Sequence, residues 1–142
     1  MSTNLFIGTW RLLSAEAKSS NGEVIYPFGK DATGFLMYGP DGYMAVTVMR
    51  PNRANFATKD FRGGTPEEKL AAFSSYLSYC GKYEVKGEKI VHQIDMSLFP
   101  NWSGDDQERF FVFSGDHLTL RTAPMKLAGA EVTAQMVWQR LS

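Results

Sequence analysis

The sequence predicts an all-β fold: a closed antiparallel up-and-down β-barrel of about eight to ten strands with one short α-helix. Short runs rich in β-branched and aromatic residues alternate with turn dipeptides along the chain. Apolar residues make up 44% of the 142 residues and glycine occurs 13 times, a composition that suits many short strands joined by tight turns. We expect a single domain that spans residues 1–142.

Nine segments are expected to form strands. The first ends at Asn21-Gly22, the strongest two-residue hairpin signal. Turns containing Gly42, Gly87 and Gly115 separate three further pairs of strands. The expected strands cover residues 9–18, 23–26, 33–38, 43–49, 76–85, 89–96, 107–114, 117–123 and 131–141. Nine strands lie within the range that closes a small barrel.

One helix is expected after residue 65. Thr65, Pro66 and Glu68 form a capping box with a proline at the first helical position. An apolar stripe follows at helical spacing, at Leu70, Phe73 and Leu77. We expect this stripe to cover one end of the barrel. The segment 50–64 before it reads as a long loop, a type that acts as a lid or contacts a partner.

Strand alternation predicts which side chains face the barrel interior. In residues 107–114 two faces compete, and we favour the face of Arg109 over the face of Phe110. The inward set then contains Tyr79, Tyr83, His92, Arg109, Phe111 and Phe113, together with Val132, Ala134, Met136 and Trp138 of the last strand. Met37, Met44 and Met96 are further candidates for the interior.

This interior is mostly apolar with a few polar groups, as in pockets for small ligands. We therefore predict that Met44, Tyr79, Tyr83, His92, Arg109 and Phe111 contact a ligand. Each polar member also has a purely structural interpretation. His92 can be a satisfied core histidine, Arg109 can form an ion pair near the rim, and the tyrosines can simply pack.

Two ends of the chain resemble the lipocalin and calycin superfamily. Gly8-Thr9-Trp10 is similar to its Gly-x-Trp motif, and Arg140 is similar to the arginine that it carries in the final strand. The resemblance implies that Trp10 plugs one barrel end and that Arg140 packs across it as a cation–π partner.

The middle of the chain resembles the bacterial and fungal lipocalin-like domain family. The matching stretches are residues 79–85, 91–93, 98–104 and 107–109. The resemblance, which spans about residues 5–139, implies a shared site at His92, Asn101, Trp102 and Arg109. Gln93 stands where the family pattern often has a second histidine, which argues against a paired-histidine role.

Composition and motifs also narrow the partners. Fifteen basic residues balance fifteen acidic ones, so we expect no nucleic acid and no membrane as a partner. No cofactor is expected, because glycine-rich nucleotide motifs are lacking, and two histidines with one cysteine argue against a metal site. The single Cys80 and a start without a signal-peptide pattern favour the cytoplasm. The sequence is compatible with a homo-oligomer.

Three functions follow from these observations. The favoured one is binding of a small, mostly apolar ligand, such as one with an acidic or carbonyl group, inside the barrel. The first alternative is a cofactor-free isomerase or cyclase that uses His92 as the catalytic proton carrier in the same cavity. The second is a solid barrel that acts as a structural or interaction module through an apolar patch near Phe56 and Phe61.

Overall fold

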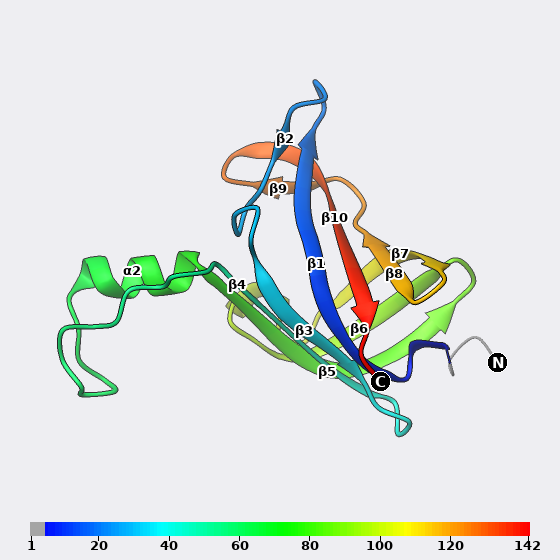
Figure 1. Cartoon of the computed structure of the whole chain (residues 1–142), viewed down its shortest axis with the longest axis horizontal. Coiled ribbons are helices and arrows are strands. Elements are labelled where there is room, and N and C mark those ends of the chain that lie inside the picture. Colours follow the sequence, from blue (N-terminus) through cyan, green and yellow to red (C-terminus); the bar gives the residue numbers. More distant parts are fainter. Residues whose placement is uncertain (1–4) are drawn as a thin grey trace.

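The computed structural model describes residues 5–142 and forms one ten-stranded antiparallel sheet (Figure 1). The strand order is β2-β1-β3-β4-β5-β6-β7-β8-β10-β9, and a further pairing of β1 with β10 closes eight strands into a barrel. The strands are β1 (Gly8–Ser19), β2 (Val24–Ile25), β3 (Thr33–Tyr38), β4 (Tyr43–Met49), β5 (Tyr76–Lys86), β6 (Lys89–Ser97), β7 (Asp106–Ser114), β8 (His117–Arg121), β9 (Met125–Leu127) and β10 (Ala130–Arg140). The predicted closed up-and-down barrel is confirmed.

The short strands β2 and β9 lie outside the closed ring. β2 pairs only with β1, and β9 pairs only with the first residues of β10. The sequence prediction omitted β9, because three residues are too few to show an alternating pattern. Both short strands lie at the end of the barrel opposite Trp10, where they lengthen its wall.

A β-bulge in β6 reverses the predicted orientation of Met96. Cys80 pairs with Met96, but the next residue, Gly81, pairs with Ile94, so Asp95 is the extra residue. A Cβ on Gly81 would lie 2.0 Å from the carbonyl oxygen of Gln93, so only glycine fits this approach. Met96 is 65% exposed on the outer face, and the prediction that it faces the interior is wrong.

Met37 also faces outward, contrary to the prediction. In β3 the buried residues are Gly34, Leu36 and Tyr38, and Met37 is 45% exposed between them. Both faces of this strand carry large apolar side chains, so the sequence pattern alone does not distinguish them. On β7 the favoured face is confirmed, because Phe111 and Phe113 pack on the core while Val112 is exposed.

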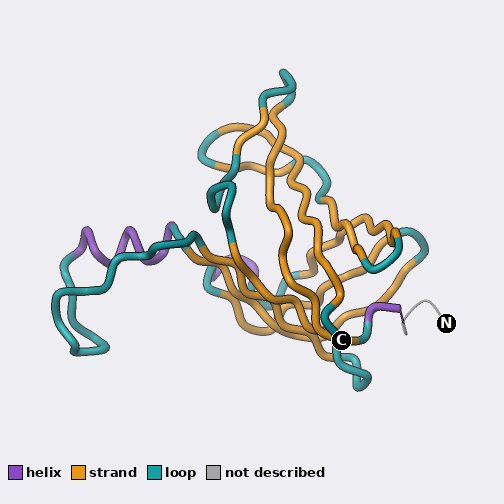
Figure 2. The backbone as a smooth tube through the Cα atoms, viewed as in Figure 1, coloured by secondary structure: helices purple, strands orange, loops and turns teal. Residues whose placement is uncertain are grey.

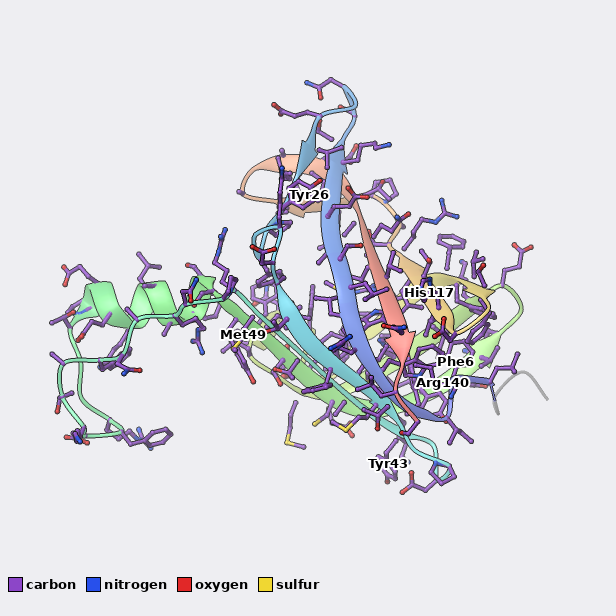
Figure 3. The ribbon with its side chains drawn as sticks, in the orientation of Figure 1. Phe6, Tyr26, Tyr43, Met49, His117 and Arg140 are labelled. Atoms are coloured by element: carbon purple, nitrogen blue, oxygen red, sulfur yellow. The ribbon has the colours of Figure 1, made fainter. Side chains whose placement is uncertain are left out.

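Trp10 closes one end of the barrel. It is 1% exposed, its Nε1 donates to the carbonyl of Phe6 at 2.9 Å, and the Arg140 guanidinium lies 4.2 Å from its ring centroid. Arg140 also donates to the carbonyls of Ile7 and Leu5. Phe6 and Arg140 lie together near the C-terminal end of β10 (Figure 3). The contact between Trp10 and Arg140 is present as predicted.

Gly8 permits this closure. Its φ of +137° is unfavourable for other residues, and a Cβ there would lie 2.1 Å from the carbonyl oxygen of Ser142. The glycine of the Gly-x-Trp motif therefore lets the start of β1 lie close to the backbone of Ser142.

Helix α2 (Pro66–Ser74) and the preceding loop project away from the barrel as an arm, which we define as residues 50–74 (Figure 2). The predicted capping box of Thr65 and Glu68 is present. However, the helix does not lie over the barrel end as predicted. Leu77 belongs to β5, Leu70 is 67% exposed, and only the last helical turn, at Phe73, reaches the barrel. No helix within residues 5–142 has the length and apolarity to cross a membrane.

Candidate functional site

A cavity of about 690 Å³ occupies the half of the barrel opposite Trp10. Its inner wall is formed by strand residues that include Leu36, Val46, Tyr79, His92, Leu120 and Trp138. Its rim is formed by connecting segments and by β9, through residues that include Phe28, Phe73, Leu98, Phe99, Trp102, Met125 and Leu127. Strand alternation positions the wall, whereas the rim depends on how loops fold over the open end.

His92 lies between two tyrosines at the cavity wall. Its Nε2 is 2.7 Å from the hydroxyl of Tyr38 on β3, and its Nδ1 is 2.7 Å from the hydroxyl of Tyr79 on β5. His92 on β6 is 1% exposed. Both nitrogens therefore have protein partners, and the three side chains bridge three strands.

All three of these groups are neutral around pH 7. Burial, with a smaller contribution from the positive charge of Arg109, lowers the pKa of His92 to about 3. Burial raises the pKa of Tyr38 and of Tyr79, although Arg109 partly offsets the rise for Tyr79. A histidine with the ordinary pKa near 6.5 would suit the proton-carrier role, but burial removes that property from His92, and the sequence does not show how completely the imidazole is enclosed.

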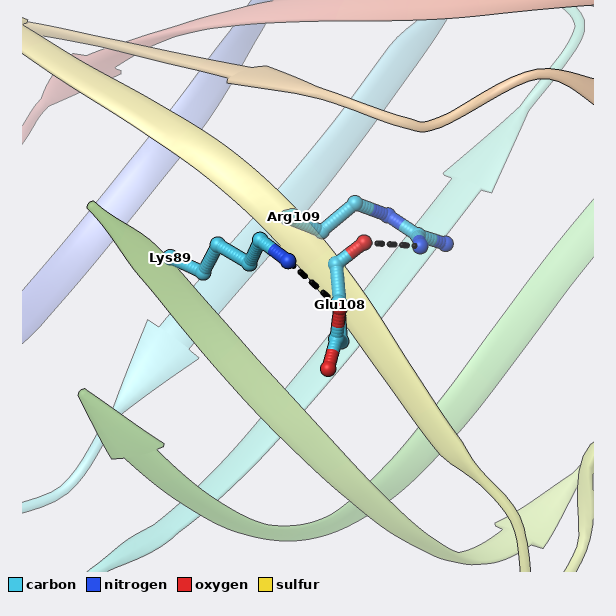
Figure 4. Close-up of polar contacts among 3 residues, drawn as sticks. All are labelled: Lys89, Glu108 and Arg109. Carbon is cyan, nitrogen blue, oxygen red and sulfur yellow. Dashed lines mark hydrogen bonds and ion pairs between the residues drawn. The ribbon is translucent and has the colours of Figure 1, made fainter. Parts of the chain in front are cut away.

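Arg109 points to the interior from β7 and lines the cavity. Its Nη1 donates to the backbone carbonyl of Glu108 at 2.9 Å and to the side-chain oxygen of Gln107 at 3.3 Å. The Glu108 carboxylate binds Lys89 at 3.0 Å instead (Figure 4). Among residues 5–142 no carboxylate lies within ion-pair distance of Arg109, so the proposed ion pair near the rim is not formed.

Four of the predicted contact residues line the cavity, namely Tyr79, His92, Trp102 and Arg109. Trp102 lies in the short helix η1 (Pro100–Trp102), where its ring packs edge-on against Tyr79 and Phe99. The neighbouring Asn101 is exposed and does not line the cavity.

The other three predicted residues pack in the closed half of the barrel. Tyr83 donates to the carbonyl of Gly39 at 2.7 Å, Phe111 packs edge-on against Phe6, and Met44 is 4% exposed in the core. Alternation places them inside the barrel correctly but does not show at which depth the cavity ends. Sequence reasoning missed Tyr38 and the loop residues Phe28 and Phe99. Tyr38 shares the inward alternation of Leu36, which was the available signal.

The geometry describes a barrel with a filled end and a hollow end. No group of three or more His, Cys, Asp or Glu side chains within residues 5–142 gathers as a metal site. Residues 7–141 match the family model described as "Lipocalin-like domain". The chain belongs to the lipocalin-like domain family.

A curated relative is the "4'-hydroxy-3'-methoxypropiophenone carrier protein ppsC" of Aspergillus oryzae. The two chains are 34% identical over 107 residues, which cover 69% of this chain and 96% of the relative. Among solved structures, an uncharacterized protein from Bacteroides eggerthii is similar at 13% identity and a TM-score of 0.47, covering 95% of this chain and 98% of that one. A mutant of the fluorescent protein UnaG is similar at 14% identity and a TM-score of 0.43, covering 99% of both chains.

Proposed function

We propose that this protein binds and carries a small, mostly apolar molecule with a carbonyl or acidic oxygen. The observation that carries the proposal is the cavity of about 690 Å³. Its volume lies within the range of about 300–1,000 Å³ typical of ligand pockets, and its walls are apolar except for a few polar groups. Tyr79 and Arg109 are polar groups in that wall that can donate a hydrogen bond to an oxygen acceptor.

The relative named as a carrier supports this proposal. The ligand in the name of that relative is an aryl ketone, a flat apolar ring with a carbonyl and polar ring substituents. Such a molecule matches a cavity bordered by the aromatic side chains Phe28, Phe99 and Trp102. Cys80 is a half-buried free thiol, which fits the proposed cytoplasmic location.

The enzyme alternative is less well supported at His92. Both imidazole nitrogens are occupied by tyrosine hydroxyls, and burial lowers the pKa of His92 to about 3. A base that is already hydrogen-bonded and weakly basic does not abstract a substrate proton efficiently. An isomerase or cyclase in this cavity would have to use Tyr79, which burial keeps protonated, as an acid.

The interaction-module alternative required a solid barrel, and the cavity argues against it. Phe61 is 97% exposed on the arm, but Phe56 packs against Gly64 rather than extending the patch. The patch predicted near Phe56 and Phe61 is therefore reduced to one phenylalanine, and singly exposed apolar residues are common on protein surfaces. Carriage of a ligand therefore remains the function that the geometry supports best.

Titration of the purified protein with 4'-hydroxy-3'-methoxypropiophenone, followed by calorimetry and tryptophan fluorescence, tests the proposal. Ala134 lines the cavity on β10, so Ala134→Phe should place a phenyl ring in it and weaken binding. Ala45 lies on the outer face of β4 beside Met37, so Ala45→Phe is the matched control and should bind as the wild type does. Equal binding by both variants would place the ligand elsewhere. No binding to the wild type by this or related aryl ketones and acids would refute the proposal.

A further inference from the structure

The chain of Tyr38, His92 and Tyr79 can hold its protons in two arrangements. A neutral imidazole has one N–H donor and one bare nitrogen that accepts. One tyrosine must therefore donate to the bare nitrogen, and the other must accept from the N–H. The tyrosine that accepts keeps its own hydroxyl hydrogen free for a third group.

The surroundings of Tyr38 distinguish the two arrangements. Tyr38 is 2% exposed and does not line the cavity, and within residues 5–142 its hydroxyl has no hydrogen-bond partner besides His92. If Tyr38 accepted from Nε2–H, its own hydroxyl hydrogen would be buried without an acceptor. A buried donor without a partner costs about 1–3 kcal/mol. Tyr38 must therefore donate to Nε2.

The rest of the arrangement follows from this direction. The proton of His92 then resides on Nδ1 and is donated to the oxygen of Tyr79. The Tyr79 hydroxyl hydrogen is left free, and Tyr79, unlike Tyr38, lines the cavity. Accepting from Nδ1–H also polarises the Tyr79 hydroxyl and makes it a stronger donor.

We propose that His92 is held as the Nδ1–H tautomer by Tyr38 and that this makes Tyr79 a dedicated hydrogen-bond donor to the carbonyl oxygen of the ligand. The recognition step rests on the proposed function, whereas the tautomer does not. Two other groups that line the cavity also favour an oxygen acceptor on the ligand. The Arg109 guanidinium favours electron-rich oxygen near Tyr79. Trp138, which also lines the cavity, has a buried Nε1–H that finds no hydrogen-bond partner among residues 5–142.

Long-range proton–nitrogen NMR of the ligand-free protein at pH 7 tests the tautomer directly. The chain has two histidines, and His117 is exposed on the outer surface beside Asp116, so His117→Asn leaves His92 as the single imidazole signal. We expect Nδ1 to be protonated and Nε2 to be bare. Tyr79→Phe should keep this tautomer, because Tyr38 sets it, whereas Tyr38→Phe should produce a mixture. Protonated Nε2 in the otherwise wild-type chain would overturn the proposal.

A pair of ligands tests the recognition step. para-Hydroxypropiophenone and para-propylphenol have similar shapes, but only the first has a carbonyl. Tyr79→Phe should weaken binding of the ketone about 3- to 10-fold, the effect of one lost hydrogen bond, and should change binding of the propylphenol less than about twofold. Equal losses for both ligands would reduce Tyr79 to a packing residue and overturn the recognition step. If the wild type binds neither, the proposed function fails, while the NMR result still decides the tautomer.

Discussion

The two ends of the barrel are built from similar residues but differ in how completely they are filled. At the closed end Trp10 is 1% exposed, its indole N–H is satisfied by Phe6, and Arg140 stacks on its ring. At the open end Trp102 is half-buried in the short helix η1 beside a cavity of about 690 Å³. The barrel therefore concentrates tight packing at one end and leaves space at the other.

This difference assigns folding stability mainly to the closed end and ligand binding to the open end. Burial of apolar surface is the dominant favourable contribution to folding, and each void in the packing forfeits part of it. A cavity kept open at one end therefore has to be offset by dense packing elsewhere, here by the edge-to-face cluster of Phe6 with Tyr38, Phe111 and Phe113. A ligand that fills the cavity should in turn raise the free energy of unfolding.

The largest predicted effect contrasts the two tryptophans. Trp10→Ala removes a fully buried indole and should lower the free energy of unfolding by about 3–5 kcal/mol, whereas Trp102→Ala should lower it by less than about 2 kcal/mol because Trp102 is partly solvated. Urea denaturation monitored by circular dichroism measures both. Trp102→Ala should instead weaken ligand binding. Equal losses of stability would show that the open end is as important for folding as the closed end.

The second effect concerns His92, which lies at the boundary between the two ends. Its pKa is about 3 in the folded protein and about 6.5 in an unfolded chain, so below pH 6.5 the unfolded chain binds a proton that the native protein does not. Stability should therefore fall as the pH decreases from about 6.5 towards 3, by about 2 kcal/mol at pH 5 from this group.

Urea denaturation at pH 7 and pH 5 tests this linkage, with His92→Gln as the control. The variant lacks the titrating group, so its loss between the two pH values should be smaller than the wild-type loss by about 2 kcal/mol. NMR of the wild type provides a second measurement, in which His92 should not titrate between pH 5 and 8. A midpoint near 6.5 would show that the imidazole is open to water.

The sequence predicts the barrel well because its information is local. Alternation in β10 and β5 and the glycine-containing turns each need only a few neighbouring residues to be recognised, and Trp10 with Arg140 needs only a motif at each end. One error arises where a single residue changes the period. Asp95 is such a residue, since the bulge there turns Met96 outward.

The site is predicted less completely because it depends on distances between strands. His92, Tyr79 and Arg109 are correctly placed inside the barrel, but alternation does not show that Tyr38 and Tyr79 occupy both nitrogens of His92. It also does not locate the depth at which the core ends and the cavity begins. The rim residues lie in connecting segments or in elements as short as β9, which are too short or too irregular to show a periodic pattern.

The smallest predicted effect tests whether the arm of residues 50–74 belongs to either end. Phe61 is 97% exposed, so Phe61→Ser should change the free energy of unfolding by less than about 0.5 kcal/mol and leave ligand affinity unchanged. Phe73→Ser is the matched comparison, because Phe73 lines the cavity rim and its loss should weaken binding. Calorimetry with the aryl ketone measures both variants. If Phe61→Ser weakens binding as much as Phe73→Ser, the arm closes over the open end in solution and acts as a lid, since Phe61 in the structure does not contribute to the cavity lining.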